Sequence, residues 1–222
     1  MGEVYLYSDL SMISLMYVVG QVSLNNQLTT QEDLASYCEG VSQAGPLQQC
    51  HFEAFVRKYI LVPINASSLS GFKPTPSAAR VSAPTTVPSA EGLSPSPLLQ
   101  GRVEDGNSEN LGGISGHAGF FATIEDVAKI GRIWLNPSAQ RILNETTVAL
   151  FTRQANHTQS SRALGWNTND PSVADYGWNL SCGKKWSSST FMHIGYTGSE
   201  GEEDGENYAL FIRFGWPIAQ EP

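Results

Sequence analysis

The chain has 222 residues, of which 41% are hydrophobic and 15% are charged, so it is long enough and apolar enough to bury a core. Its 13 basic and 21 acidic residues give a net charge of −8, which argues against nucleic acid or an anionic membrane surface as the main partner. No run approaches the roughly 20 apolar residues of a membrane span, and the N-terminus lacks the basic-then-apolar order of a signal peptide.

The first predicted element is a helix that follows Tyr7-Ser8-Asp9 and runs to Val22. Ser8 or Asp9 can cap its N-terminus, and its residues are apolar on almost every side. We therefore expect other parts of the protein to bury this helix all round. Two further helices are expected at residues 30–38 and 51–62, and Pro63 stops the second of them.

Residues 74–100 shift the composition to Pro, Ser, Thr and Ala, with few large apolar side chains. Such a segment cannot bury enough surface to order itself, so we expect a long irregular connection. A connection of this kind is either disordered or packed against the protein near a functional site, and the composition favours disorder.

A glycine-rich loop leads into a capped amphipathic helix at residues 111–134, and Thr123 is the expected cap. Tightly turned or left-handed backbone suits the four glycines of this loop, Gly112, Gly113, Gly116 and Gly119. The spacing matches neither a P-loop nor a dinucleotide-binding loop, which argues against a phosphate cradle. His117 could serve as a ligand or a base, but a loop histidine bonded to backbone is the better interpretation of the sequence alone.

The pattern changes from helices to strands after residue 136. A short helix is predicted from Asn144 to Phe151, and strands are predicted at residues 163–166, 176–180, 190–195 and 208–216. Helices followed by strands indicate an α+β fold with an antiparallel sheet. We expect a mainly helical region at 1–135 and a short helix with strands at 136–222, both within one domain.

The cysteines and the glycosylation patterns favour the secretory route. Cys38 and Cys50 bracket a short loop that a disulfide would close, whereas Cys182 is either a small apolar filler or a thiol paired outside this chain. Four asparagines fit the N-glycosylation pattern: Asn65, Asn144, Asn156 and Asn179. We therefore expect a secreted protein whose signal peptide lies upstream of Met1.

Neither a metal nor a cofactor is indicated. The histidines show no metal-ligand spacing, and no Cys-rich motif accompanies them. We interpret the acidic run at residues 200–206 as a solvated loop, with a divalent-ion site as the minor alternative.

Four motifs follow one another along the chain in a characteristic order. They are Tyr7-Ser8-Asp9, residues 57–63 ahead of Gly71-Phe72, residues 112–121 ahead of 123–126, and residues 193–198. In order and rough spacing they resemble the β-lactamase-related serine hydrolases, which include class C β-lactamases, penicillin-binding-protein-like esterases and DD-peptidases. The resemblance extends over nearly the whole chain and implies a β-lactamase/penicillin-binding-protein-like fold, here with an incomplete sheet.

The resemblance implies hydrolysis of a small-molecule or peptide-like ester or amide through an acyl-serine. Tyr7 would assist proton transfer, Asp9 stands where the family usually has Asn, and His193 takes the strand position that lines the cleft. The Asp and His variants resemble the esterase-like branch. Gly195, Thr197 and His117 would contact the substrate, and Gly195 would leave room for it.

The family's nucleophile, a Ser-x-x-Lys at a helix N-terminus, is not evident. Ser70 to Lys73 and Ser181 to Lys184 match the pattern, but Gly71 and Pro74 oppose a helix at the first of them. Both also follow Tyr7, whereas the family's nucleophile precedes this element. We expect the C-terminal part of such a hydrolase, inactive by itself. The alternatives are a non-catalytic binding or structural module of the same fold, and a replacement nucleophile at Ser70 or Ser181.

Overall fold

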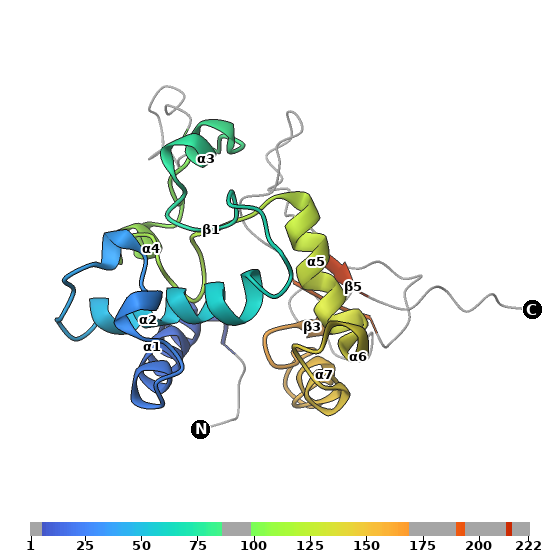
Figure 1. The fold of residues 1–222 in the computed structure, drawn as a ribbon. Coiled ribbons are helices and arrows are strands. Elements are labelled where there is room, and N and C mark those ends of the chain that lie inside the picture. The colour runs from blue at the N-terminus through green and yellow to red at the C-terminus, as the bar shows by residue number, and fades with distance from the viewer. Residues whose placement is uncertain (1–5, 86–98, 169–189, 194–211, 215–222) are drawn as a thin grey trace, which may run out of the picture. The chain divides into compact units, whose positions relative to one another are not determined.

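The computed structural model describes residues 6–85, 99–168 and 190–193 and the backbone of 212–214, and the chain divides into two compact units (Figure 1). The helical unit comprises Ser8–Asp126. The second unit comprises Met1–Tyr7 and Val127–Pro222. In the part of the chain that is described, no helix has the length and apolar character needed to cross a membrane.

The helical unit is organised around α1 (Asp9–Asn25) and α2 (Pro46–Val56), which lie against each other (Figure 1). Ser8 caps α1 as predicted, because its side chain accepts a hydrogen bond from the backbone N–H of Leu10 at 3.3 Å. The two helices approach closely at Gly20, where an added Cβ would stand 2.0 Å from the carbonyl oxygen of Gln48. Glycine is therefore required at this crossing.

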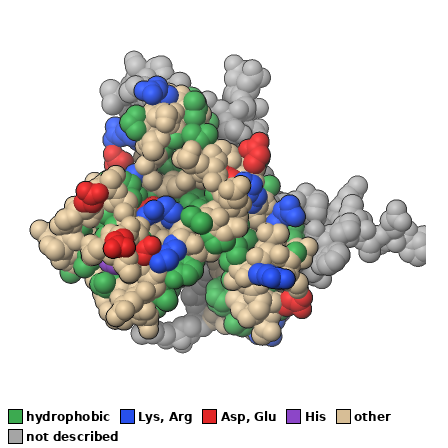
Figure 2. Space-filling view, viewed as in Figure 1, with side chains coloured by type: hydrophobic (Ala, Val, Ile, Leu, Met, Phe, Trp, Pro, Cys, Tyr) green, Lys and Arg blue, Asp and Glu red, His purple; other side chains and the backbone are tan. Residues whose placement is uncertain are grey.

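The expectation that α1 is buried all round is wrong within the helical unit. Only one side of α1 is covered, with Met16 packing into a small core beside Phe72 and Ile114. Four large apolar side chains of the same helix remain 48–69% exposed: Leu10, Leu15, Val18 and Val22. Hydrophobic side chains accordingly lie among polar ones on the visible surface (Figure 2). A helix that is apolar on every side needs more than one packing partner, and α2 covers a single face.

Two other helix predictions need correction. The segment predicted as a helix at 30–38 forms two short 3-10 turns, η1 (Gln31–Asp33) and η2 (Ser36–Cys38). The helix predicted at 51–62 begins earlier, at the start of α2, where Pro46 occupies the first helical position, and ends in a π-helical turn, η3 (Arg57–Leu61). A disulfide joins Cys38 to Cys50 and ties η2 to α2.

The Pro/Ser-rich segment is partly helical. α3 (Pro76–Val81) forms because the Thr75 hydroxyl accepts from the backbone N–H of Ala78 and Pro76 supplies helical φ at the first position. A small sheet pairs β1 (Gly71–Phe72) with β2 (Phe120–Phe121), Phe72 lying opposite Phe120. The remaining helix of this unit is α4 (Gly106–Asn110). Residues 86–98 of the predicted loop lie outside the described part.

The second unit packs helices beside short strands. Its helices are most of α5 (Ile124–Leu135), α6 (Pro137–Gln140) and α7 (Glu145–Thr152), and its strands are β3 (Asn167–Thr168), β4 (Phe191–His193) and β5 (Ile212–Phe214). The strands form an antiparallel sheet in the order β3-β4-β5. Four aromatic rings form a chain of contacts in this unit. The ring centroids are 6.3 Å apart for Phe151 and Trp134, 5.1 Å for Trp134 and Trp166, and 5.2 Å for Trp166 and Phe191.

Two of the predicted strands are found in the structure, one is wrong, and one lies outside the described residues. β4 and β5 fall within the strands predicted at 190–195 and 208–216, and α7 confirms the short helix capped by Asn144. The strand predicted at 163–166 is instead a tight turn, in which Gly165 has φ +84° and the N–H of Ala163 donates to the carbonyl of Trp166. The local strand begins one residue later, at Asn167. Residues 176–180 lie outside the described part.

Candidate functional site

Three titratable side chains converge beside the N-terminus of α1. They are Asp9, Asp105 and His117, and each offers one carboxylate oxygen or ring nitrogen lying within 4.8 Å of the other two. The three come from separate segments of the helical unit: the first turn of α1, the N-cap of α4 and the glycine-rich loop. The structure thus brings together two of the residues that the sequence singled out, Asp9 and His117.

The glycine-rich loop reaches α1 through backbone contacts that no larger residue would permit. An added Cβ on Gly116 would stand 2.1 Å from the carbonyl oxygen of Met12, one turn along α1 from Asp9. The loop is anchored from the other side by Gln49 of α2, whose side-chain amide donates to the carbonyls of Leu111 and Ile114 at 2.8 and 2.9 Å. These contacts fix where His117 lies relative to α1.

His117 is held by hydrogen bonds at both ring nitrogens. Its Nε2 lies 2.7 Å from Oδ1 of Asp105, its Nδ1 lies 2.8 Å from the hydroxyl of Ser115, and its side chain is only 5% exposed. The histidine therefore bonds side chains, and the interpretation that it bonds backbone is corrected. A buried imidazole bonded on both sides cannot rotate freely, so its Nε2 stays directed at Asp105.

Asp105 is also held by a hydrogen bond within its own segment. Its Oδ1 also accepts the backbone N–H of Ser108 at 2.7 Å and so caps α4. Burial acts to raise the pKa of this carboxyl, but the hydrogen bonds from Ser108, His117 and Asn107 outweigh it and lower the pKa below its ordinary value. The neighbouring Glu104 behaves oppositely, because burial and the charge of Asp105 raise its pKa.

Asp9 presents a carboxylate that the described residues leave without a hydrogen bond or an ion pair. It lies in the first turn of α1, where the helix dipole favours a negative charge. The Asp9 side chain is therefore half-buried and is not held in place by a hydrogen bond to another described residue.

Asp105, His117 and Ser115 form a hydrogen-bonded chain that resembles a Ser-His-Asp triad in composition. Ser115, however, is only 2% exposed, so its hydroxyl cannot meet a substrate. Its role is to hold the imidazole in place. Sequence reasoning missed both Asp105 and Ser115, although Asp105 three residues ahead of Ser108 is a recognisable helix-capping signal.

The other predicted site residues belong to the second unit or lie outside the described part. Tyr7 is 63% exposed, and its ring lies 5.8 Å from the guanidinium carbon of Arg162. His193 is the last residue of β4 and is exposed. Gly195 and Thr197 lie outside the described residues.

Ser70 is not arranged as a nucleophile. Its hydroxyl donates to Oδ2 of Asp126 at 2.7 Å and accepts the backbone N–H of Thr123 at 3.2 Å. Lys73 has φ +50° and places its ammonium 4.5 Å from the centre of the Tyr37 ring. The pair does not share a helical turn, so Lys73 is not positioned to act as the base for Ser70. Ser181 and Lys184 lie outside the described residues.

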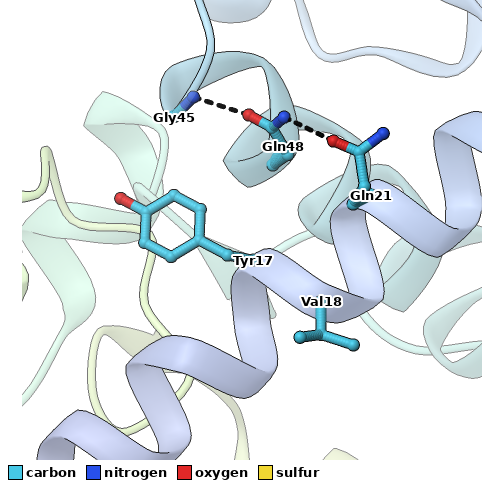
Figure 3. Close-up of a pocket in the computed structure, with 5 residues that line it drawn as sticks. All are labelled: Tyr17, Val18, Gln21, Gly45 and Gln48. Atoms are coloured by element: carbon cyan, nitrogen blue, oxygen red, sulfur yellow. Dashed lines mark hydrogen bonds between the residues drawn. The ribbon is translucent and has the colours of Figure 1, made fainter.

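A surface hollow of about 350 Å³ lies beside α1 and α2, away from any carboxylate (Figure 3). Its lining is Tyr17, Val18, Gln21, Gly45 and Gln48. The amide groups satisfy one another, because the N–H of Gly45 donates to Gln48 and the side chain of Gln48 donates to Gln21 at 2.6 Å (Figure 3). Its lining contains no carboxylate, imidazole, amine or thiol.

Three of the four predicted glycosylation sites are exposed. Asn65 and Asn156 lie in turns and Asn144 caps α7, so each side chain is at the surface. Asn179 lies outside the described residues, as does Cys182.

Comparison with known proteins finds relatives of part of the chain. A protein named "Putative D-alanyl-D-alanine carboxypeptidase" from Salmonella agona (strain SL483) is 30% identical over 121 residues, which are 53% of this chain and 27% of that protein. The protein of the same name from Salmonella gallinarum (strain 287/91 / NCTC 13346) is 31% identical over the same lengths. The chain thus matches about a quarter of each relative. No protein-family profile and no solved structure matches it.

Proposed function

We propose that this chain forms part of the catalytic domain of a β-lactamase-like serine hydrolase that cleaves a peptide-like amide or ester. The observation that carries the proposal is the 121-residue similarity to proteins named as D-alanyl-D-alanine carboxypeptidases. That name favours a peptide ending in D-alanine over other amides as the substrate class. The meeting of Asp9 with His117 supports it, because the resemblance names both of their motifs as parts of one site.

In the proposed reaction a serine hydroxyl attacks the substrate carbonyl, the amine or alcohol leaves with a proton, and water then hydrolyses the acyl-serine. Tyr7 transfers the proton to the leaving group. His193 and Gly195 line the strand side of the cleft, and Thr197 contacts the substrate. Within this chain Ser70 is engaged by Asp126, so the proposal assigns the nucleophile and its lysine to a segment outside these residues.

Secretion is part of the proposal. The disulfide between Cys38 and Cys50 and the exposed Asn65, Asn144 and Asn156 are features that suit an oxidising, glycosylating compartment. A peptide ending in D-alanine is consistent with a site outside the cytoplasm.

The proposal is tested with a fluorescent serine-acylating probe, either a penicillin or a fluorophosphonate. The 222-residue chain alone is expected to stay unlabelled, whereas the chain joined behind an added upstream segment containing Ser-x-x-Lys is expected to be labelled at that serine. Tyr7→Phe in the joined protein should slow labelling by about 10²–10⁴-fold. Circular dichroism confirms that each protein is folded. A folded joined protein that takes no label would overturn the proposal, and label on Ser70 would move the nucleophile into this chain.

A second candidate is a non-catalytic module with a penicillin-binding-like fold. The engagement of Ser70 by Asp126 favours it, because Ser70 and Lys73, the Ser-x-x-Lys match within the described residues, are not arranged as nucleophile and base. Under this hypothesis the 222-residue chain alone is a stable monomer that binds a D-alanine-terminated peptide without cleaving it. Calorimetry with such a peptide, followed by product analysis, separates the two candidates.

A further inference from the structure

The Asp9, Asp105 and His117 cluster has a ligand geometry that a hydrogen-bonded loop does not need. We propose that these three residues form a binding site for one divalent transition-metal cation of the Zn²⁺ or Mn²⁺ type. Two of the three residues, Asp9 and His117, also belong to the proposed hydrolase site, but the metal proposal is argued from the geometry of this cluster alone. The three segments that carry it are each fixed by capping or by close backbone packing.

Distance and mobility both suit a common metal ion. Ligands of a tetrahedral Zn²⁺ with bonds of about 2.0–2.2 Å lie roughly 3.4 Å apart. The pair formed by His117 Nε2 and Asp105 Oδ1 is hydrogen-bonded at 2.7 Å and must open slightly to hold a cation, and all three ligand atoms lie within 4.8 Å of one another. Asp9 is the ligand that must move inward, and no described residue bonds its carboxylate.

The histidine already has the outer contact typical of a metal ligand. Metal-bound histidines usually donate the N–H of their second ring nitrogen to an oxygen, which fixes the tautomer and aims the first nitrogen at the metal. The buried hydroxyl of Ser115 lies 2.8 Å from Nδ1 and can accept this N–H. When a cation binds Nε2, that nitrogen carries no proton, so the neutral imidazole has its one proton on Nδ1 and donates it to Ser115.

Charge balance also favours a cation. Asp9 and Asp105 place two carboxylates around one imidazole, and Glu104 adds a third acid next in sequence. The nearest cationic side chain in the sequence, Arg102, is ion-paired with Glu109. Lys73, which approaches the loop at Gly113, holds its ammonium over Tyr37. Neither of these two side chains is paired with the cluster, so a bound cation would offset the repulsion between its two carboxylates.

The mixture of ligands selects the class of metal. Imidazole suits Zn²⁺, Fe²⁺ and Cu²⁺, whereas carboxylates alone suit Mg²⁺ and Ca²⁺. One nitrogen with two oxygens therefore favours Zn²⁺ or Mn²⁺ over the alkaline-earth ions. Three protein ligands leave room for water or a further ligand on the metal.

The test is a calorimetric titration of the metal-stripped 222-residue chain with Zn²⁺ and Mn²⁺, and with Mg²⁺ and Ca²⁺ for comparison. One equivalent of Zn²⁺ or Mn²⁺ is expected to bind, with Mg²⁺ and Ca²⁺ at least about tenfold weaker. Asp9→Asn removes one ligand while keeping shape, so Zn²⁺ affinity should fall by about 10–100-fold. Glu32→Gln is the matched control, because it removes the same charge from an exposed residue outside the cluster and should leave affinity unchanged.

One further variant and a measurement of folding test the interpretation. Ser115→Ala keeps all three ligands but frees the imidazole, and it should weaken Zn²⁺ binding by about tenfold. Circular dichroism and the thermal midpoint, measured without metal, show whether Asp9→Asn and Ser115→Ala keep the fold. Absence of stoichiometric binding to the folded chain, or equal affinity of the parent and Asp9→Asn, would mean that the cluster only anchors the loop by hydrogen bonds.

Discussion

The helical unit and the second unit achieve their packing by opposite means. In the helical unit, backbone meets backbone at Gly20 and Gly116, where an added Cβ would stand about 2 Å from a carbonyl oxygen. In the second unit, large rings at 134, 151, 166 and 191 fill the space between helices and strands, with centroids 5.1–6.3 Å apart. The first arrangement is sensitive to added atoms and the second to lost ones.

The buried polar groups differ in the same way. Among the described residues, those of the second unit are all Gln, Ser, Asn or Thr, which do not titrate. The helical unit also buries His51, Glu53 and Asp126, which do. Among the described residues, close backbone packing is thus combined with buried titratable side chains only in the helical unit. It is also the unit that contains the Asp9, Asp105 and His117 cluster.

The largest effect is expected from removing a ring in the second unit. Trp166 contacts both Trp134 and Phe191, so Trp166→Ala opens a cavity between α5 and the sheet. The expected loss is about 3–5 kcal/mol in the free energy of unfolding, measured by urea denaturation. Trp166→Phe keeps a ring and should cost clearly less. Equal losses for the two variants would show that the aromatic chain does not stabilise this unit.

A smaller effect is expected from adding one methyl group to the helical unit. In Gly20→Ala the new Cβ meets the carbonyl of Gln48, which no side-chain rotation can relieve, so the expected cost is about 2–3 kcal/mol. Gly106→Ala is the matched control, because a Cβ there meets nothing within 4 Å and the position is helical. It should be neutral or slightly stabilising by urea denaturation. A neutral Gly20→Ala would refute the packing argument for α1 and α2.

Local sequence signals predicted the start of a helix correctly where a side chain caps its first turn. Ser8 and Asn144 predict the starts of α1 and α7, and the structure has both caps. Left-handed or tightly turned backbone was predicted for all four glycines of the loop, and three of them, Gly112, Gly113 and Gly119, have φ of +80°, +83° and +96°. The same rule, applied to Thr75-Pro76, would have found α3, but the Pro/Ser-rich composition concealed it.

Long-range contacts could not be predicted in this way. Asp9 and Asp105 are far apart in the sequence, and only the approach of Gly116 to Met12 brings the loop to α1. Histidine spacing therefore gave no sign of the cluster. The exposure of Leu15 and Val18 could not be predicted from the sequence pattern either. Periodicity shows which residues are apolar, but it does not show how many other elements will cover them.

The smallest effect expected is a loss of stability in mild acid that begins in the helical unit. His51 is 1% exposed, its Nδ1 lies 2.8 Å from the Thr29 hydroxyl, and its Nε2 has no hydrogen-bond partner among the described residues. Burial lowers the pKa of His51 below 6.5, although the charge of Asp33 partly opposes this. The unfolded chain therefore takes up a proton first as the pH falls through 6.5, and the folded state loses stability until His51 itself is protonated.

Two optical signals can separate the units in this titration. All five tryptophans of the chain lie within the second unit, so their fluorescence reports that unit, whereas far-ultraviolet circular dichroism is dominated by helices such as α1 and α2. Between pH 7 and pH 5, the urea midpoint from circular dichroism should fall further than the midpoint from fluorescence. His51→Asn keeps a polar group near Thr29 without an imidazole and should remove the difference. If the two midpoints fall together in the parent protein and in His51→Asn alike, the acid sensitivity does not arise from the buried histidine.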